Sequence, residues 1–239
     1  MPETPSAELQ SENGKISDSQ QESTNPQQSD QHSQNFTVVA LGDSLTRGTG
    51  DVTGKGYVGY MMDQLRENSK QEMVLYNLGI RGLTSTQLAQ QVKQKQVQKQ
   101  LQSADMIVIT IGGNDLFRGG QTLMEKDFDQ ISQIQTKYLA NLGGILSSIR
   151  SVNAKGTIYF VGLYNPFNQQ ADAETTSQIV REWNHNTANL TAKYPKTVFV
   201  PTADIFQLNV ADYLYSDKFH PNAEGYRLIG ERIASLVRQ

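Results

Sequence analysis

Short apolar runs recur along the chain and predict five buried strands. Each run is too continuous for a strand with one solvated face, and each is followed by a polar or glycine-containing turn. Such runs are typical of the fully buried strands of a parallel sheet. The predicted strands are Phe36–Leu41, which stops at Gly42, and Met73–Leu78, Met106–Ile111, Thr157–Leu163 and Thr197–Val200.

Helical periodicity fills most of the segments between these runs. Apolar residues step by three and four positions in residues 129–150, in residues 175–194 and in the last segment of the chain. A weaker Gln- and Lys-rich pattern predicts one surface helix near residues 85–102, anchored by Leu88, Val92 and Leu101. Alternating strands and helices favour right-handed crossovers, so we expect a parallel sheet with helices on both faces. In such a sheet, ligands bind beyond the carboxyl ends of the strands.

The first 35 residues have a different composition from the rest of the chain. Their only apolar side chains are those of Met1, Ala7, Leu9 and Ile16, among many Gln, Ser and Asn residues. This is too little apolar surface to offset chain entropy, so we expect a disordered polar tail or tether at residues 1–35 and one domain at residues 36–239. The tail carries a charge of −5 in a chain of net charge −3, which leaves +2 on the domain.

These features exclude several classes of function. A charge of +2 supplies no basic surface for nucleic acid, and zero cysteines rule out thiol catalysis and disulfides. No apolar run is long enough to span a membrane, and no pair of histidines has metal-ligand spacing. We therefore expect no metal, no cofactor and no nucleic acid, and a protein that acts as a monomer.

The location of the protein is predicted only from its leader. A Gln- and Ser-rich tether suits an enzyme held at the cell envelope by a region not present in this sequence, so we expect an extracytoplasmic or cell-surface protein. A ragged terminus explains the same composition, and a cytoplasmic location stays open. Lys93, Lys95 and Lys99 fit a solvated helix face, with contact to a membrane surface as the alternative.

The residues that follow the strands include a nucleophile and a base. A serine attacks an acyl carbon only when a base takes its proton, and imidazole titrates near neutral pH. Of the three histidines, His32 falls in the tail and His185 lies opposite the apolar stripe of its helix. His220 remains, with Asp217 three residues earlier to orient its ring and with Asn222 as the predicted N-cap of the last helix.

The nucleophile candidate is Ser44, in the turn after the first strand. The negative oxygen of a tetrahedral intermediate needs two or three N–H donors. The backbone N–H of Ser44, the backbone N–H of Gly79 and the side-chain amide of Asn114 would all lie at the same end of the sheet. Asp43 and Asp115 are expected to brace the adjoining loops, and Asp204 is a remoter rival of Asp217 as the triad acid.

Two further assignments concern the loop and the apolar side chains around this site. The glycine-rich segment Gly48–Gly54 fits neither a dinucleotide fingerprint nor a phosphate loop, and we interpret it as a flexible loop beside the nucleophile. Several apolar side chains in the same loops either line an acyl pocket or simply pack in the core. They are Leu116, Phe117, Tyr164, Phe167, Phe206, Tyr213 and Phe219.

Four short blocks of the sequence resemble one known family. Gly42-Asp43-Ser44-Leu45, Asn77-Leu78-Gly79, Gly113-Asn114-Asp115 and Asp217-Lys218-Phe219-His220-Pro221 are similar to the four blocks of the SGNH, or GDSL-like, hydrolases of the bacterial lipase/acylhydrolase type. The resemblance extends from about Phe36 to the end of the chain. It implies a three-layer α/β/α sandwich around a five-stranded parallel sheet of flavodoxin-like type, with no metal.

The resemblance also implies roles for the candidate residues. Ser44 would be the nucleophile, His220 the base and Asp217 its orienting acid, with the N–H groups of Ser44, Gly79 and Asn114 as the oxyanion hole. The implied activity is that of a serine esterase or lipase-like acylhydrolase that cleaves carboxylic esters or thioesters, including lipid esters, through an acyl-enzyme. A carbohydrate O-acetylesterase acting on cell-wall or capsule sugars is the alternative, and a non-catalytic binding module on the same fold is a third.

Overall fold

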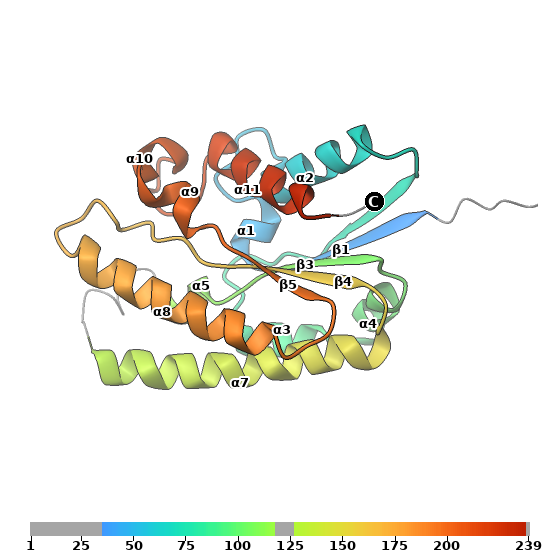
Figure 1. The fold of residues 1–239 in the computed structure, drawn as a ribbon, viewed down its shortest axis with the longest axis horizontal. Helices are drawn as coiled ribbons and strands as arrows, with labels where there is room; N and C mark the ends of the chain where they lie inside the picture. The colour runs from blue at the N-terminus through green and yellow to red at the C-terminus, as the bar shows by residue number, and fades with distance from the viewer. Residues whose placement is uncertain (1–34, 118–126, 238–239) are drawn as a thin grey trace, which may run out of the picture. The chain divides into compact units, whose positions relative to one another are not determined.

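Five parallel strands form one sheet in the order β2-β1-β3-β4-β5 (Figure 1). The computed structural model describes residues 35–117 and 127–237, which fall within one compact unit, Ser33–Gln239. Apart from Asn35, the predicted tail lies outside the described residues. The sheet confirms the predicted strands, although three of them end one or two residues earlier than expected. The strands are β1 (Phe36–Gly42), β2 (Met73–Asn77), β3 (Met106–Thr110), β4 (Thr157–Val161) and β5 (Thr197–Val200).

Helices cover both faces of the sheet and give the expected three-layer α/β/α arrangement. In Figure 1, α2 (Gly56–Glu67) and α11 (Ala223–Ser235) lie above the sheet. Below it lie α3 (Ser85–Gln91), α4 (Lys95–Gln102), α7 (Phe128–Val152) and α8 (Ala173–Thr191). Short helices follow the strands at one end: α1 (Ser44–Arg47), α5 (Gly113–Phe117), α9 (Ala203–Gln207) and α10 (Val210–Tyr213). None of the described helices is both long and apolar enough to cross a membrane.

Alternate residues of the central strands feed two separate apolar cores. Val39 and Ile107 pack with the α3, α4, α7 and α8 layer, whereas their neighbours Val38 and Val108 pack with α2 and α11. Side chains of successive strand residues point to opposite faces, so a strand buried on both sides must be apolar throughout. This double burial explains the continuous apolar runs.

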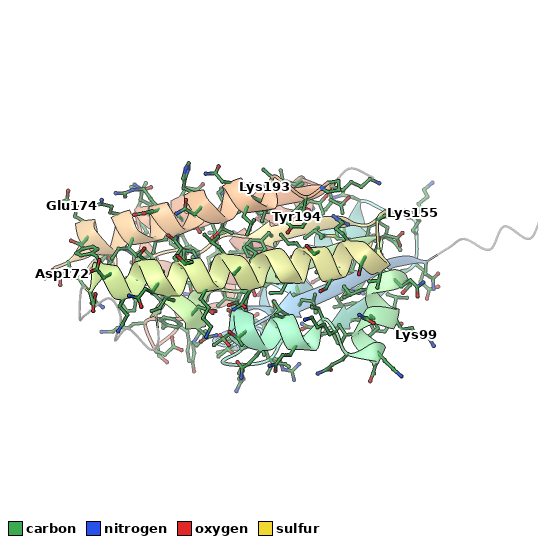
Figure 2. All side chains as sticks on the ribbon, turned by 90° about the horizontal axis from the view of Figure 1, so that it is seen from below. Lys99, Lys155, Asp172, Glu174, Lys193 and Tyr194 are labelled. Carbon is green, nitrogen blue, oxygen red and sulfur yellow. The ribbon has the colours of Figure 1, made fainter. Side chains whose placement is uncertain are left out.

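The lower layer is held by two long helices that lie side by side. Figure 2 shows α7 and α8 running in the same direction, with Tyr194 between them. The Tyr194 hydroxyl donates to the carbonyl of Gly143 at 2.9 Å, which ties the segment after α8 to the middle of α7. Trp183 and Tyr138 also meet across the two helices, with ring centroids 4.4 Å apart.

One helix prediction was wrong. The surface helix expected near residues 85–102 is two helices, α3 and α4, with a break at residues 92–94. Leu88 and Val92 are four positions apart, but Val97 follows Val92 by five, which in an unbroken helix would turn Val97 away from the sheet. The break restores burial to both pairs, because Val97 and Leu101 are then buried like Leu88 and Val92.

The order of the strands sets the place of the site. The chain passes from β1 to β2, which pairs with one edge of β1, and then to β3, which pairs with the other edge of β1. The carboxyl ends of β1 and β3 therefore flank the crevice where doubly wound sheets bind ligands. Gly42, the last residue of β1, pairs with Thr110, the last residue of β3, so the loops that follow them start side by side.

The side-chain amide of Asn153 stabilises the fold far from this crevice through hydrogen bonds to four backbone groups. It is buried at the end of α7, and its Nδ2 donates to the carbonyls of Leu101 and Ala104, each at 2.6 Å. Its Oδ1 accepts from the N–H groups of Lys155 and Gly156 at 2.9 and 2.7 Å. Replacing it with alanine removes one hydrogen-bond partner from each of these four backbone groups.

We expect Asn153→Ala to lower the free energy of unfolding by about 2–4 kcal/mol, because each unsatisfied buried group costs about 1–3 kcal/mol before relaxation. Urea unfolding followed by circular dichroism measures this loss. Asn189→Ala is the matched control, since Asn189 is exposed and contacts only the equally exposed His185 ring in the described part of the chain. Equal stabilities for the two variants would contradict the role assigned to Asn153.

Candidate active site

The turn that carries Ser44 is shaped by the glycine before it. Gly42 has φ +139°, and a Cβ atom there would lie 2.0 Å from the carbonyl oxygen of Thr110. Only glycine fits this approach of β1 to β3. The Asp43 N–H then donates to the same carbonyl at 3.2 Å, and Asp43 caps α1 by accepting from the N–H of Leu45 at 3.0 Å. Ser44 is thus fixed as the first residue of α1.

A second loop brings His220 to the same point from the other end of the chain. Asp217 Oδ1 accepts from the N–H groups of Phe219 and His220, each at 3.0 Å, and Lys218 takes the left-handed conformation with φ +56°. The Tyr164 hydroxyl donates to the Phe219 carbonyl at 2.6 Å, which ties the loop to the end of β4. Asn222 caps α11 by accepting from the N–H of Gly225 at 3.0 Å, as the sequence predicts.

Ser44, His220 and Asp217 lie in line. His220 Nε2 is 2.8 Å from Ser44 Oγ, and His220 Nδ1 is 2.7 Å from Asp217 Oδ2. With its proton on Nδ1, donated to Asp217, the ring presents Nε2 as an acceptor for the Ser44 hydroxyl. Ser44 is only 7% exposed and the His220 side chain 18%, so the contact is partly shielded from water.

The electrostatics of Asp217 favour its ionised form. Burial alone would raise its pKa, but the hydrogen bonds from the His220 ring and from the N–H groups of His220 and Phe219 outweigh burial and hold the pKa below its ordinary value of 3.8. The carboxylate therefore stays charged at neutral pH. A charged partner stabilises the imidazolium that forms when His220 accepts a proton.

Two of the three expected oxyanion donors have an N–H group without an acceptor among the described residues. Among the described residues, no group accepts from the Ser44 N–H. Asn114 Nδ2 uses one hydrogen to donate to the Leu83 carbonyl at 2.9 Å and retains a second. Asn114 also lines both cavities that contain Ser44.

Gly79 has a different environment from the one expected. Its N–H donates to Asn77 Oδ1 at 3.1 Å, and it lines neither cavity that contains Ser44. A Cβ at Gly79 would lie 2.7 Å from the backbone nitrogen of Arg47, so close packing against the end of α1 explains the glycine. Donation to an oxyanion by Gly79 would require its N–H to leave Asn77.

The other candidates take structural positions. Asp115 accepts from the backbone N–H and hydroxyl of Ser85 at 2.9 and 2.6 Å, in agreement with a bracing role. Asp204 pairs with Arg232 at 2.6 Å and does not contact His220. His185 is exposed, as expected, and no group of three or more metal-binding side chains occurs among residues 35–117 and 127–237.

The apolar candidates divide into two groups. Phe117, Tyr164 and Phe219 line a small apolar cavity that opens at Ser44, and Phe167 lines the larger hollow outside it. Leu116 and Phe206 are fully buried in the core, and Tyr213 packs against Phe206. The segment Gly48–Gly54 does lie beside the nucleophile. A Cβ at Gly50 would be 3.0 Å from the His220 Cβ, and Asp51 accepts from the N–H groups of Thr53 and Gly56.

The sequence reasoning missed a set of buried polar groups beneath Ser44. Thr46, Tyr57 and Thr110 form a connected set of hydroxyls, all of them buried. The available signal was a polar residue, Thr110, in the otherwise apolar run Met106–Ile111. A buried hydroxyl in such a run needs a hydrogen-bond partner, but the sequence does not identify the residue that provides it.

Comparison with known proteins adds independent information. Residues 40–228 match the family model described as the GDSL-like Lipase/Acylhydrolase family. The chain is 32% identical over 211 residues to the uncharacterized protein YpmR of Bacillus subtilis (strain 168), covering 86% of this chain and 83% of YpmR. It is 28% identical over 198 residues to the spore germination lipase LipC of Bacillus licheniformis, covering 82% of this chain and 93% of LipC.

A solved structure resembles the fold closely. The crystal structure of the lipase Lip_vut3 from a goat rumen metagenome superimposes with a TM-score of 0.77 at 26% identity. The match covers 84% of this chain and 97% of the lipase. The similarity therefore includes nearly the whole of the solved lipase.

Proposed function

The chain belongs to the GDSL-like lipase/acylhydrolase family and is an ester-cleaving hydrolase, and on this premise we propose that it works as a serine esterase through an acyl-enzyme. The observation that supports the mechanism most directly is the line from Ser44 Oγ to His220 Nε2 and from His220 Nδ1 to Asp217 Oδ2, at 2.8 and 2.7 Å. Residues 176 positions apart meet there in the geometry that nucleophilic catalysis needs.

The first half of the reaction forms the acyl-enzyme. Ser44 Oγ attacks the ester carbonyl carbon while His220 Nε2 takes the hydroxyl proton, and the carbonyl oxygen becomes the oxyanion. The Ser44 N–H and the second N–H of Asn114 Nδ2 stabilise that oxygen. The imidazolium then gives its proton to the leaving alkoxide, the carbon–oxygen bond breaks and the alcohol departs. Asp217 holds the ring and balances its positive charge.

The second half regenerates the enzyme. A water molecule gives a proton to His220 Nε2 and attacks the acyl carbon, and the same donors stabilise the second oxyanion. His220 then protonates Ser44 Oγ as the acyl–oxygen bond breaks, and the carboxylic acid leaves. Each step uses only this chain's side chains, the ester and water.

The two cavities that contain Ser44 differ in size, which bears on the substrate. The cavity toward the core has a volume of about 20 Å³, room for about one water molecule or methyl group. Its walls are mostly apolar and include Leu45, Ile111, Phe117, Leu163 and Phe219. A second hollow that contains Ser44 has about 520 Å³, and Arg81, Gln170 and Lys218 add polar groups to its lining.

This difference favours one particular substrate class as a second candidate function, a carbohydrate O-acetylesterase. A third hollow of about 520 Å³ shares Gln170 and Lys218 with the second and adds Gln169, Tyr215 and Ser216. Amide, hydroxyl and aromatic side chains are groups that bind the hydroxyls and faces of sugars. The proposed substrate therefore has a short acyl group in the small cavity and a larger polar alcohol in the open hollows.

We expect kcat/KM for 4-nitrophenyl esters to fall by about tenfold or more from acetate to butyrate, because the extra methylenes do not fit a 20 Å³ cavity without moving its walls. Hydrolysis by the purified protein across chain lengths measures this. A rise in kcat/KM up to octanoate would contradict the short-acyl proposal and favour an esterase that acts on lipid esters. Hydrolysis of none of the esters would contradict the esterase itself.

Phe117→Ala tests whether the cavity sets this preference. Phe117 is buried in the cavity wall, with its ring 5.7 Å from those of Phe167 and Phe219. The variant should raise kcat/KM for the butyrate ester relative to that for the acetate ester. Phe199→Ala is the matched control, since Phe199 stacks on Phe160 within the sheet and should leave the ratio unchanged.

We also propose that the protein acts outside the cytoplasm as a tethered monomer. The support is the Gln- and Ser-rich composition of residues 1–35 and the small charge of the remaining chain. Fractionation of cells that express the natural gene tests the location, and recovery of all the protein in the cytoplasm would contradict it.

A further inference from the structure

A buried carboxyl lies directly behind the nucleophile and takes no part in the triad. Asp43 is 3% exposed, precedes Ser44 in the chain and lines the small apolar cavity that opens at Ser44. Its Oδ1 accepts from the N–H of Leu45 at 3.0 Å and lies 3.2 Å from the hydroxyl of Thr110. Among the described residues no cation is paired with it.

Asp43 is the end of a chain of hydroxyl groups. Thr110 Oγ1 lies 2.7 Å from Thr46 Oγ1. Thr46 Oγ1 in turn lies 2.8 Å from the Tyr57 hydroxyl and 3.0 Å from the carbonyl oxygen of Leu41. Together with the contact between Thr110 and Asp43, these are four oxygen–oxygen contacts at hydrogen-bonding distance.

The hydroxyls do not carry enough protons for all four contacts. The Leu41 carbonyl only accepts, so the proton of Thr46 goes to it. The contact between Tyr57 and Thr46 then uses the proton of Tyr57. The contact between Thr46 and Thr110 is the shortest of the four at 2.7 Å, whereas that between Thr110 and Asp43 is the longest at 3.2 Å, which favours placing the proton of Thr110 in the shorter contact. No hydroxyl proton is left for the contact between Thr110 and Asp43.

From this count and these distances we infer that Asp43 is protonated in the active form of the enzyme, where its carboxyl donates to Thr110 Oγ1 and holds the turn that carries Ser44. The inference rests on the proposed function only for its effect on catalysis. Asp43 is a positioning residue, because it acts on the turn and does not touch the reacting atoms in the proposed mechanism. Ionised, it would leave two oxygen lone pairs facing each other and a negative charge behind the forming oxyanion.

The surroundings of Asp43 agree with a neutral acid. Burial raises its pKa from 3.8 to about 7, which outweighs the lowering by hydrogen bonds that favour its charged form, such as that from the Leu45 N–H, and the nearby Asp115 carboxylate raises it further. Acyl binding in the cavity would remove still more water from it. The titratable groups whose charges interact with Asp43 are Asp115 on α5, Tyr57 on α2, Tyr138 on α7, Tyr164 after β4 and Tyr226 on α11.

Isotope-edited infrared spectroscopy tests the inference without any substrate. In protein labelled with carbon-13 at the aspartate carboxyl, a protonated-carboxyl band should be present at about pH 6 and disappear with a midpoint near pH 7. Asp43→Asn should lack the band, and the exposed Asp204→Asn control should keep it. Absence of the band in the wild-type protein at about pH 6 would overturn the inference, and this result needs no variant to fold.

Two further readouts connect the proton to stability and rate. A raised pKa in the folded state means that wild-type protein loses stability relative to Asp43→Asn as pH rises from about 4 to about 7, after which the difference is constant. The ratio of kcat/KM in Asp43→Asn to that in wild type should rise by about fivefold from pH 7 to pH 8, following the loss of protonated Asp43.

These readouts separate the proposal from its rivals. A rate ratio that is flat with pH would overturn the catalytic effect of the proton, and a flat stability difference would overturn the proton itself. If the protein hydrolysed no ester, the proposed function would fail, while the infrared and stability results would still decide the protonation of Asp43. If Asp43→Asn does not fold, Asp115→Asn replaces it, because removal of that carboxylate should shift the band's midpoint to lower pH.

Discussion

Replacing Ser44 by alanine should lower kcat by about 10⁴–10⁶-fold, the range expected when the nucleophile of a serine hydrolase is removed. The proposed mechanism has no other group to form the acyl-enzyme, since Ser44 Oγ is the oxygen that His220 Nε2 contacts at 2.8 Å. The residual rate would come from binding and from the oxyanion donors. The fold should be unchanged, because the Ser44 hydroxyl makes no hydrogen bond except with His220 in the described part of the chain.

The measurement is turnover of 4-nitrophenyl acetate, with circular dichroism and thermal unfolding as checks on the fold. Ser151→Ala is the matched control, since Ser151 is an exposed serine near the end of α7 and contacts only the carbonyl of Ser148. It should keep wild-type kcat. A Ser44→Ala protein that retained a tenth of wild-type turnover would show that another residue is the nucleophile.

Replacing His220 by alanine should lower kcat about as much as Ser44→Ala does, whereas the loss of kcat in Asp217→Ala should be about 10–100-fold smaller. Without the ring, nothing removes the Ser44 proton. Without Asp217, the ring can still reach Ser44, but its tautomer and charge are no longer supported. Asp217 also orders the loop through the N–H groups of Phe219 and His220, so part of its effect comes from lost positioning.

His185→Ala is the matched control for the histidine, because His185 is exposed on α8 and its ring contacts Asn189. It should leave kcat unchanged. Asp212→Ala, which removes an exposed carboxylate on α10, is the control for Asp217. Equal losses in Asp217→Ala and His220→Ala would contradict the orienting role of Asp217, and full activity in His220→Ala would contradict the triad.

Much of the fold could be predicted because the strands are buried on both faces. A strand such as β3 must be apolar at every position, so the run Met106–Ile111 identifies it without any alternation. The helix α2 was missed although its buried residues follow the same periodicity as the other helices. No helix-start signal precedes it, because the helix begins at Gly56 and Lys55 before it makes no side-chain cap. The buried residues are Tyr57, Val58, Met61, Met62 and Leu65.

The candidate triad could be predicted because chain order and sheet topology place its parts. Ser44 follows β1, and the loop that carries His220 lies between β5 and the last helix. The carboxyl ends of parallel strands lie at the same edge of the sheet, so the two residues are expected there. The environment of Gly79 could not be predicted, because it depends on the side chain of Asn77, which accepts from Gly79 and donates to the Thr46 carbonyl. No sequence pattern specifies that contact.

The hydroxyl chain beneath the site was out of reach for a related reason. Thr46 and Thr110 are 64 positions apart, and they meet because the register of β1 and β3 pairs Gly42 with Thr110. Register follows from packing of the whole sheet. Sequence can flag a buried hydroxyl, but only the assembled sheet shows its partners and the proton that they lack.

Reaction with a fluorophosphonate followed by peptide mass spectrometry tests the central claim most directly, because the probe bonds only to a serine whose proton has a base to receive it. We predict one phosphonyl group per chain, on the peptide that contains Ser44, with none on Ser44→Ala and greatly slowed labelling of His220→Ala. A protein that hydrolyses esters but carries the adduct elsewhere, or carries none, would contradict the assignment of Ser44 and His220.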